Sequence, residues 1–188
     1  MQVIVPSKSI PIDHPIRQMA RFVDANEWRL QHSTETEISV EIPGKWSDYC
    51  LTFTWQDSYA ALHVNAFMDI FIVDQQIASA LEVITEINSQ IWLGHFDLIA
   101  DDGSVVFRHN LPLRGTGGAT PEQIEDLVDI TLGECERAYP ALLTKIGMPG
   151  HIVGHLEIWR SEQHCFWDLQ ISKWPMKWPG IPILVGPK

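Results

Sequence analysis

The residues best suited to metal chemistry gather in one C-terminal stretch of this 188-residue sequence. His151 and His155 are four positions apart, so a helix would place both imidazoles on one face, and His164 and Cys165 follow shortly after. Imidazole nitrogens and a thiolate are common ligands of zinc. Gly154, however, lies between the two histidines and disfavours a helix there. We therefore interpret this group as structural and predict no metal, with a metal site as the alternative.

A glycine-rich segment, Arg114–Gly118, precedes a predicted helix that opens at Thr120. Exposed N–H groups at a helix N-terminus, together with the helix dipole, can hold a phosphate or another anion. The segment lacks the Lys-Ser/Thr pair of a phosphate-binding P-loop, and it does not follow a predicted parallel strand. We interpret it as a flexible connection and predict no cofactor, with anion binding as the alternative.

Nucleophilic catalysis has no recognisable constellation in this sequence. Neither a G-x-S-x-G turn nor a family-type cysteine signature is present. His63, His95 and His109 could converge in space, although histidines on a sheet surface are the more common outcome. Asp101 and Asp102 belong to a predicted turn, where aspartate is favoured for backbone reasons. We predict no catalytic residues and a protein that is not an enzyme.

Aromatic side chains crowd the segment 151–188, which holds half of the chain's eight tryptophans. The predicted partner-binding residues are Trp159, Phe166, Trp167, Trp174 and Trp178. Prolines that follow the last two tryptophans disfavour a regular helix and favour extended backbone. Tryptophan is enriched at binding hot spots, and a large apolar surface is rarely left exposed. The segment docks either on its own domain or a twin subunit, which we favour, or on a foreign protein.

The charge of the chain is strongly negative and unevenly distributed. The formal net charge is -11, of which residues 1–150 contribute -12 and residues 151–188 contribute +1. An acidic body repels phosphate backbones and anionic membrane surfaces, so we expect no nucleic-acid or membrane partner. The opposite charge of the C-terminal segment favours its docking on the acidic body.

Sorting signals and cysteine usage favour the cytoplasm. The N-terminus lacks a charged region followed by a long apolar stretch, so it does not resemble a secretory signal. No run of residues approaches the ~18 apolar positions that a membrane helix requires. The three cysteines are an odd number and show no C-x-x-C pairing, which fits a reducing compartment. We expect a cytoplasmic protein.

Hydrophobic periodicity predicts a helix and three strands in the first half of the chain. A cap at Asp13 and a first-turn proline, Pro15, predict a short helix. Alternation of apolar and polar residues then predicts strands over 37–42, 49–55 and 62–68. One face of this sheet is apolar and the other is mixed, which is typical of an antiparallel sheet covered on one side.

A helix, a tight hairpin and a second helix follow. Apolar residues at helical spacing predict a helix that is capped by Asp74 and ends at Gly94. The sequence Asp101-Asp102-Gly103 predicts the turn of the hairpin, because these residue types tolerate positive φ. Thr120 and Gln123 predict a capping box at the start of the last helix.

The predicted order of elements is αβββαββα. This order indicates an α+β domain in which helices pack against an antiparallel sheet. We place the domain at residues 13–147, after an irregular arm at 1–12 and before a Trp/Pro-rich extension at 148–188. The length of the chain fits one such domain with a tail.

The helix–hairpin–helix unit resembles the YbjN family, whose members are described as putative bacterial sensory-transduction regulators. The resemblance is carried by Glu86-Ile87-Asn88, Gly94-His95-Phe96-Asp97-Leu98, Asp101-Asp102-Gly103 and Val106-Phe107-Arg108, and by Thr120-Pro121-Glu122-Gln123 and Tyr139-Pro140 in the last helix. It covers residues 13–147. It implies a fold like that of type III secretion chaperones, often dimeric, and a regulatory or chaperone-like role without established catalytic residues.

These observations predict a non-enzymatic regulatory or chaperone-like module that binds proteins and forms a homodimer. It would act through apolar sheet and helix surfaces, with the C-terminal segment as a lid or docking arm. The alternative is a small-ligand or metal-binding protein, an enzyme included. That protein would use the 151–165 His/Cys group or the 114–118 loop.

Overall fold

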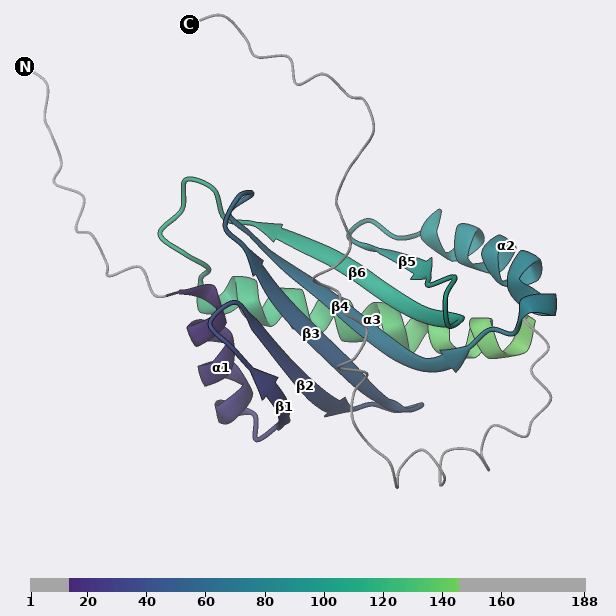
Figure 1. Cartoon of the computed structure of the whole chain (residues 1–188), viewed down its shortest axis with the longest axis horizontal. Coiled ribbons are helices and arrows are strands. Elements are labelled where there is room, and N and C mark those ends of the chain that lie inside the picture. The colour runs from purple at the N-terminus through teal and green to yellow at the C-terminus, as the bar shows by residue number, and fades with distance from the viewer. Residues whose placement is uncertain (1–13, 146–188) are drawn as a thin grey trace, which may run out of the picture.

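The computed structural model describes residues 14–145, which form a sheet with three α-helices (Figure 1). In chain order its elements are α1 (Pro15–Ala25), β1 (Arg29–Ser33), β2 (Glu37–Pro43), β3 (Asp48–Gln56), β4 (Ala61–Phe71), the 3-10 turn η1 (Asp74–Gln76), α2 (Ile77–Asn88), β5 (His95–Leu98), β6 (Ser104–Pro112) and α3 (Pro121–Lys145). The α+β class predicted from the sequence is therefore confirmed.

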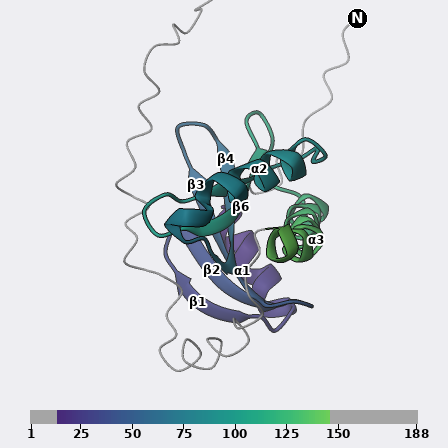
Figure 2. The same ribbon diagram turned by 90° about the vertical axis from the view of Figure 1, so that its right-hand side faces the viewer.

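The six strands form one antiparallel sheet in the order β1-β2-β3-β4-β6-β5. The helices α1 and α3 lie on the same side of this sheet, which Figure 2 shows edge-on. The helix α2 precedes β5 in the chain and packs near that edge strand and against α3. We call the side of the sheet that faces α1 and α3 the core face, and the opposite side the outer face.

The apolar core lies between the core face and the helices. Cross-strand partners in the middle of that face are Val40, Leu51, Ala66, Phe107 and Phe96, and each is at most 2% exposed. The apolar stripes of the helices complete the core. Its helical members include Ile16, Met19 and Val23 of α1, Ala80, Val83, Ile84 and Ile87 of α2, and Leu127, Cys135 and Leu142 of α3. This burial of apolar area is the main force that holds the helices on the sheet.

Two local motifs predicted from the sequence are confirmed in detail. The Gln123 N–H donates to the Thr120 hydroxyl at 3.2 Å, and the Thr120 N–H donates to the Gln123 side chain at 2.9 Å, which is a reciprocal capping box. At the hairpin turn, Gly103 has a φ of 74° and the Ser104 N–H donates to the Asp102 carboxylate at 2.8 Å. Both motifs depend on contacts between near neighbours in the chain.

The predicted element order is wrong at one place, because it omits β1. The strand consists of Arg-Leu-Gln-His-Ser, and its single aliphatic residue, Leu30, is 49% exposed, so no apolar alternation marks it. Its pairing with β2 is supported instead by polar contacts to Glu41, whose carboxylate lies 3.3 Å from the Arg29 guanidinium and accepts from the Gln31 amide at 2.6 Å. Edge strands of this polar kind are common, since they discourage further pairing.

The predicted bounds of the second helix are also corrected. Asp74 opens the turn η1 and does not cap the helix, whose N-cap is Gln76 with no side-chain cap bond. The helix ends at Asn88 and not at Gly94, because the Asn88 side chain bonds to the next strand. Asp13, the predicted cap of the first helix, lies outside the described residues, and His14 is the cap there.

Among residues 14–145, no helix combines the length and the apolar character that a membrane span would need.

Candidate functional site

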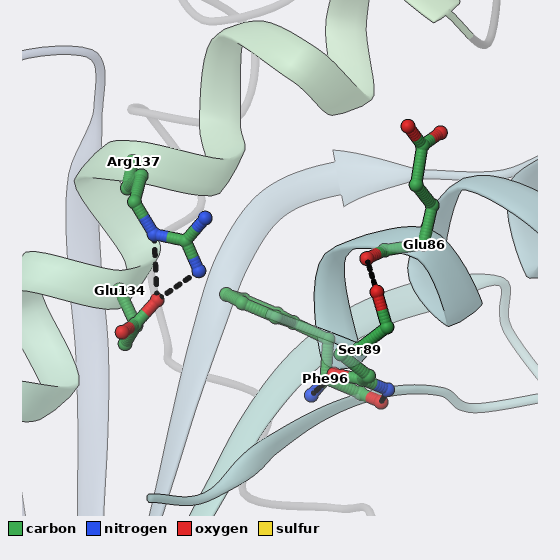
Figure 3. Close-up of polar contacts among 6 residues, drawn as sticks. Glu86, Ser89, Phe96, Glu134 and Arg137 are labelled. Atoms are coloured by element: carbon green, nitrogen blue, oxygen red, sulfur yellow. Dashed lines mark hydrogen bonds and ion pairs between the residues drawn. The ribbon is translucent and has the colours of Figure 1, made fainter. Parts of the chain in front are cut away.

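The connection between α2 and β5 is fixed by one amide side chain. The Asn88 Nδ2 donates to the carbonyl oxygen of Phe96 at 2.9 Å, and the Asn88 Oδ1 accepts from the Phe96 N–H at 2.7 Å. Asn88 thereby pairs with the edge of β5 as another strand would. The helix end is held as well, since the Ser89 hydroxyl donates to the Glu86 carbonyl at 2.7 Å (Figure 3).

A small groove lies between α2 and α3, with a volume of about 120 Å³. Its apolar lining is Val83, Ile87, Ala138 and Ala141, and its polar lining is Glu86, Gln90 and Arg137. The Arg137 guanidinium is oriented by Glu134, whose carboxylate accepts from Nε at 2.9 Å and from Nη2 at 2.5 Å (Figure 3). The groove is thus apolar with a polar edge that carries both signs of charge.

Two large apolar residues that follow the groove residue Gln90 in the chain are exposed. Trp92 is 98% exposed and Leu93 is 49% exposed, directly before Gly94. The φ of Gly94 is +80°, and a side chain there would collide with the Phe107 ring and the Arg108 carbonyl oxygen. The connection therefore leaves α2 at a fixed point and meets β5 at a fixed point. An indole presented in this way is typical of a binding surface.

The sequence interpretation missed this surface. It assigned residues 74–94 to one helix and treated the end of that helix as a cap. The available signal was the pair Trp92 and Leu93, which directly precedes Gly94 at the predicted end of the helix. The exposure of this pair, however, depends on where the helix ends.

Of the three histidines that could converge, the sheet brings two to the same face. His63 and His95 lie on the outer face, on the rows that contain Asn110 and Arg108, whereas His109 follows the opposite parity on β6. The His63 ring nitrogens bond to Asn110 at 2.8 Å and to Asn65 at 3.0 Å. Burial lowers the pKa of His63, although these two bonds oppose the shift, and burial lowers the pKa of His109 as well.

The lowered pKa values predict an acid-sensitive fold. An unfolded histidine takes up a proton near pH 6.5, whereas folded His63 and His109 do so only at lower pH. The unfolded state therefore binds more protons in that window, and stability should fall as the pH drops below about 6.5, by up to about 1.4 kcal/mol per pH unit for each histidine. Urea unfolding at pH 8 and pH 5.5 measures this change. The variant His63→Gln should lose less stability than the native sequence over the same range, and an unchanged loss would contradict the prediction.

Two further candidates inside the described residues, Cys135 and the loop Arg114–Gly118, have structural roles. Burial raises the pKa of the Cys135 thiol, with Glu134 and Glu136 adding to the shift, so this free cysteine stays protonated and unreactive. The loop Arg114–Gly118 is closed by its own Thr116, whose hydroxyl donates to the Leu113 carbonyl at 2.7 Å. These contacts agree with its interpretation as a connection.

The strongest metal candidates, His151, His155, His164 and Cys165, lie outside the described residues. So do the five aromatic residues predicted to bind a partner. Within residues 14–145, no group of three or more His, Cys, Asp or Glu side chains is placed to hold a metal ion. Metal binding by the C-terminal group stays a prediction, and elemental analysis of the purified full-length protein tests it.

The fold and the surface define a class: an α+β domain with an antiparallel sheet, a helix layer on one face, and an exposed apolar connection. A family model named YbjN, described as "Putative bacterial sensory transduction regulator", matches residues 15–144. The match spans more than half of the chain, so the chain belongs to the YbjN family, as the resemblance implied.

A solved structure supports the same fold. The crystal structure of YbjN, a putative transcription regulator from E. coli, superposes with a TM-score of 0.51 at 12% sequence identity. The likeness covers 71% of this chain and 95% of that chain. At this identity it shows a shared fold. No curated protein matches the sequence.

Proposed function

We propose that the chain is a non-enzymatic regulatory module that binds a protein partner through the surface formed by Trp92, Leu93 and the α2–α3 groove. The exposure of Trp92 carries this proposal, because this tryptophan is 98% exposed on a connection that is fixed at both ends. The regulatory description of the YbjN family supports it.

The chemistry of the groove specifies the kind of segment that fits. A volume of about 120 Å³ with an apolar lining accommodates one aliphatic side chain. The surrounding body is acidic, with -12 over residues 1–150, and Glu86 lines the groove itself. The partner is therefore a protein segment that offers one leucine- or methionine-sized anchor with basic residues beside it.

The proposal includes the finer predictions made from the sequence. The role is chaperone-like, the protein is a cytoplasmic homodimer, and the segment 148–188 is a lid or docking arm whose contacts are Trp159, Phe166, Trp167, Trp174 and Trp178. Light-scattering mass measurement of the full-length chain tests the dimer. A mass of one chain across the micromolar range would contradict it.

Trp92 supplies the direct test of the binding surface. A photo-reactive side chain at Leu93 identifies the protein that contacts it, and the affinity of that purified partner is then measured for the native chain and for Trp92→Ala. We expect the variant to bind roughly 30-fold more weakly or worse, since a buried tryptophan anchor contributes ~2 kcal/mol or more.

The matched control is Tyr59→Ala, because Tyr59 is an aromatic residue in the β3–β4 turn that is 62% exposed. This control should bind as the native chain does. Equal weakening by both variants, or none by Trp92→Ala, would rule out the proposed surface.

A further inference from the structure

The large apolar residues that are exposed within residues 14–145 are unevenly distributed. Five of the eight lie in α2 or immediately around it, and they are Phe71, Val73, Leu81, Trp92 and Leu93. Single exposed apolar residues are normal on a protein surface, whereas a group of neighbouring ones marks a contact surface. Trp92 and Leu93 belong to the surface proposed above, so the other three indicate a second contact.

Leu81 lies on the side of α2 that faces β5. Leu81 and Asn88 are seven residues apart, which is almost two turns, so their side chains share one side of the helix. The side chain of Asn88 bonds to the backbone of Phe96 on β5, which identifies this side. The groove residue Glu86, by contrast, is about 140° away from Leu81 around the helix axis. The Leu81 side and the α2–α3 groove are therefore two different sides of the same helix.

Phe71 and Val73 lie where β4, the end of β5 and the start of α2 come together. Phe71 is the last residue of β4 and pairs with Ser104, the first residue of β6. The Ser104 carbonyl in turn accepts from the N–H of Ile99, directly after β5, at 2.9 Å. Val73 leads from β4 into η1 and α2. We call Phe71, Val73 and Leu81 the α2–β5 surface, and they are 40%, 54% and 46% exposed, respectively.

The charge around the α2–β5 surface is predominantly negative. Residues 71–102 contain six acidic residues and no lysine or arginine. The acidic residues are Asp74, Glu82, Glu86, Asp97, Asp101 and Asp102. One of them, Asp97, forms an ion pair with Arg108 at 3.6 Å. An apolar surface with a negative rim favours a partner that combines apolar and basic side chains.

The outer edge of β5 is closed to a further strand. Asn88 occupies both the N–H and the carbonyl of Phe96. The Asp97 carboxylate accepts from the Leu98 N–H at 2.9 Å. An extended peptide beside β5 would lack these backbone partners, and its own N–H and carbonyl groups would lose water without gaining a bond. A helix satisfies its backbone groups internally and docks through side chains, so it fits the α2–β5 surface better than a strand does.

We propose that the partner docks a basic amphipathic helix alongside α2 on the α2–β5 surface, with Leu81 at the centre of the contact. The helix belongs to the partner that contacts Trp92, so this step rests on the proposed function. The 12 residues of α2 span about 18 Å, which a partner helix of about three turns covers. The anchor for the α2–α3 groove then comes from partner residues that pass Trp92 at the end of α2, so the partner holds α2 from both sides.

A peptide titration on the full-length chain tests the form of the partner. The probe is a fluorescently labelled peptide of leucine and lysine, about 15 residues long, whose leucines repeat with the helical period. One control peptide has the same composition with leucine and lysine in strict alternation, and another has glutamate in place of lysine. We expect the helical basic peptide to bind with an affinity that falls at high salt, and both control peptides to bind at least about tenfold more weakly.

Two variants with equally exposed leucines locate the peptide on the surface. Leu81→Ser should weaken binding of the helical peptide about tenfold, because the central apolar contact is lost. The matched control is Leu30→Ser, since Leu30 is 49% exposed but lies on β1, at the opposite edge of the sheet from β5. This control should bind as the native chain does. Equal effects of the two variants, or equally tight binding of the alternating peptide, would overturn the proposal.

A photo-reactive side chain at position 81 of the full-length chain identifies the natural occupant. We expect a link to the same protein that position 93 identifies, at a peptide with a basic amphipathic pattern. A link to a second copy, a link to another part of the same chain, or no link would overturn the proposal. The two proposals can fail separately. Partner affinity that Trp92→Ala leaves unchanged would remove the Trp92 surface, whereas affinity that only Leu81→Ser leaves unchanged would remove the docked helix.

Discussion

Replacing Gly103 with alanine is expected to destabilise the domain by about 3 kcal/mol or more. Gly103 closes the β5–β6 hairpin with a φ of 74°, a conformation that costs a residue with a side chain ~1–2 kcal/mol. An added Cβ would also collide with the backbone carbonyl of Ile72, at the end of β4. That carbonyl belongs to a peptide backbone and cannot move aside as a flexible side chain would. The conformational strain and the collision both disfavour alanine here, so the total cost exceeds that of the strain alone.

Gly115 is the matched control for this change. Its φ is 82°, close to that of Gly103, but an added Cβ there meets nothing within 4 Å. Gly115→Ala should therefore cost only the conformational strain of ~1–2 kcal/mol. Urea unfolding of both variants at the same pH measures the difference. Equal losses for the two variants would show that the contact with Ile72 is not the cause.

The Gly103 turn also shows which parts of the fold can be predicted from the sequence. Its residue types, Asp-Asp-Gly, indicate the backbone conformation that the turn itself requires. The capping box of Thr120 and Gln123 likewise indicates the start of α3. The strand β1 gives no such signal, because its partner Glu41 lies on another strand and its own residues are mostly polar. These two local motifs were therefore predicted correctly, although the predicted Asp74 cap was wrong. The edge strand β1, held by long-range contacts, was missed.

The candidate surface is harder to predict for the same reason. The exposure of Trp92 depends on the early end of α2, and that end depends on a bond between Asn88 and the backbone of Phe96. The groove needs α2 and α3 to lie side by side, although Ile87 and Ala138 are 51 positions apart in the chain. Periodicity reports the apolar stripe of each helix but gives no information on how two stripes meet.

Phe107→Ala is the second large expected effect, a loss of about 3–5 kcal/mol in the free energy of unfolding. Phe107 is fully buried on the core face between Ala66 and Phe96. Its ring meets the Phe96 ring edge-on, with 5.1 Å between centroids, and forms the wall against which Gly94 packs. Removal of the ring leaves a cavity and loses both contacts, so β5 is the strand that loosens first.

The effect of the cavity on the free energy of unfolding can be separated from the effect of losing the aromatic ring. Phe107→Leu retains most of the volume and should cost much less, about 1–2 kcal/mol, while Tyr59→Ala, on an exposed aromatic residue, should cost no more than about 0.5 kcal/mol. Hydrogen exchange adds a local measurement: the Phe96 amide, which donates to Asn88 at 2.7 Å, should exchange faster in Phe107→Ala than in Phe107→Leu. If the amide stays equally protected in both variants, Phe107 does not hold β5 in place. The position of the Trp92 surface would then depend on Asn88 and Gly94 alone.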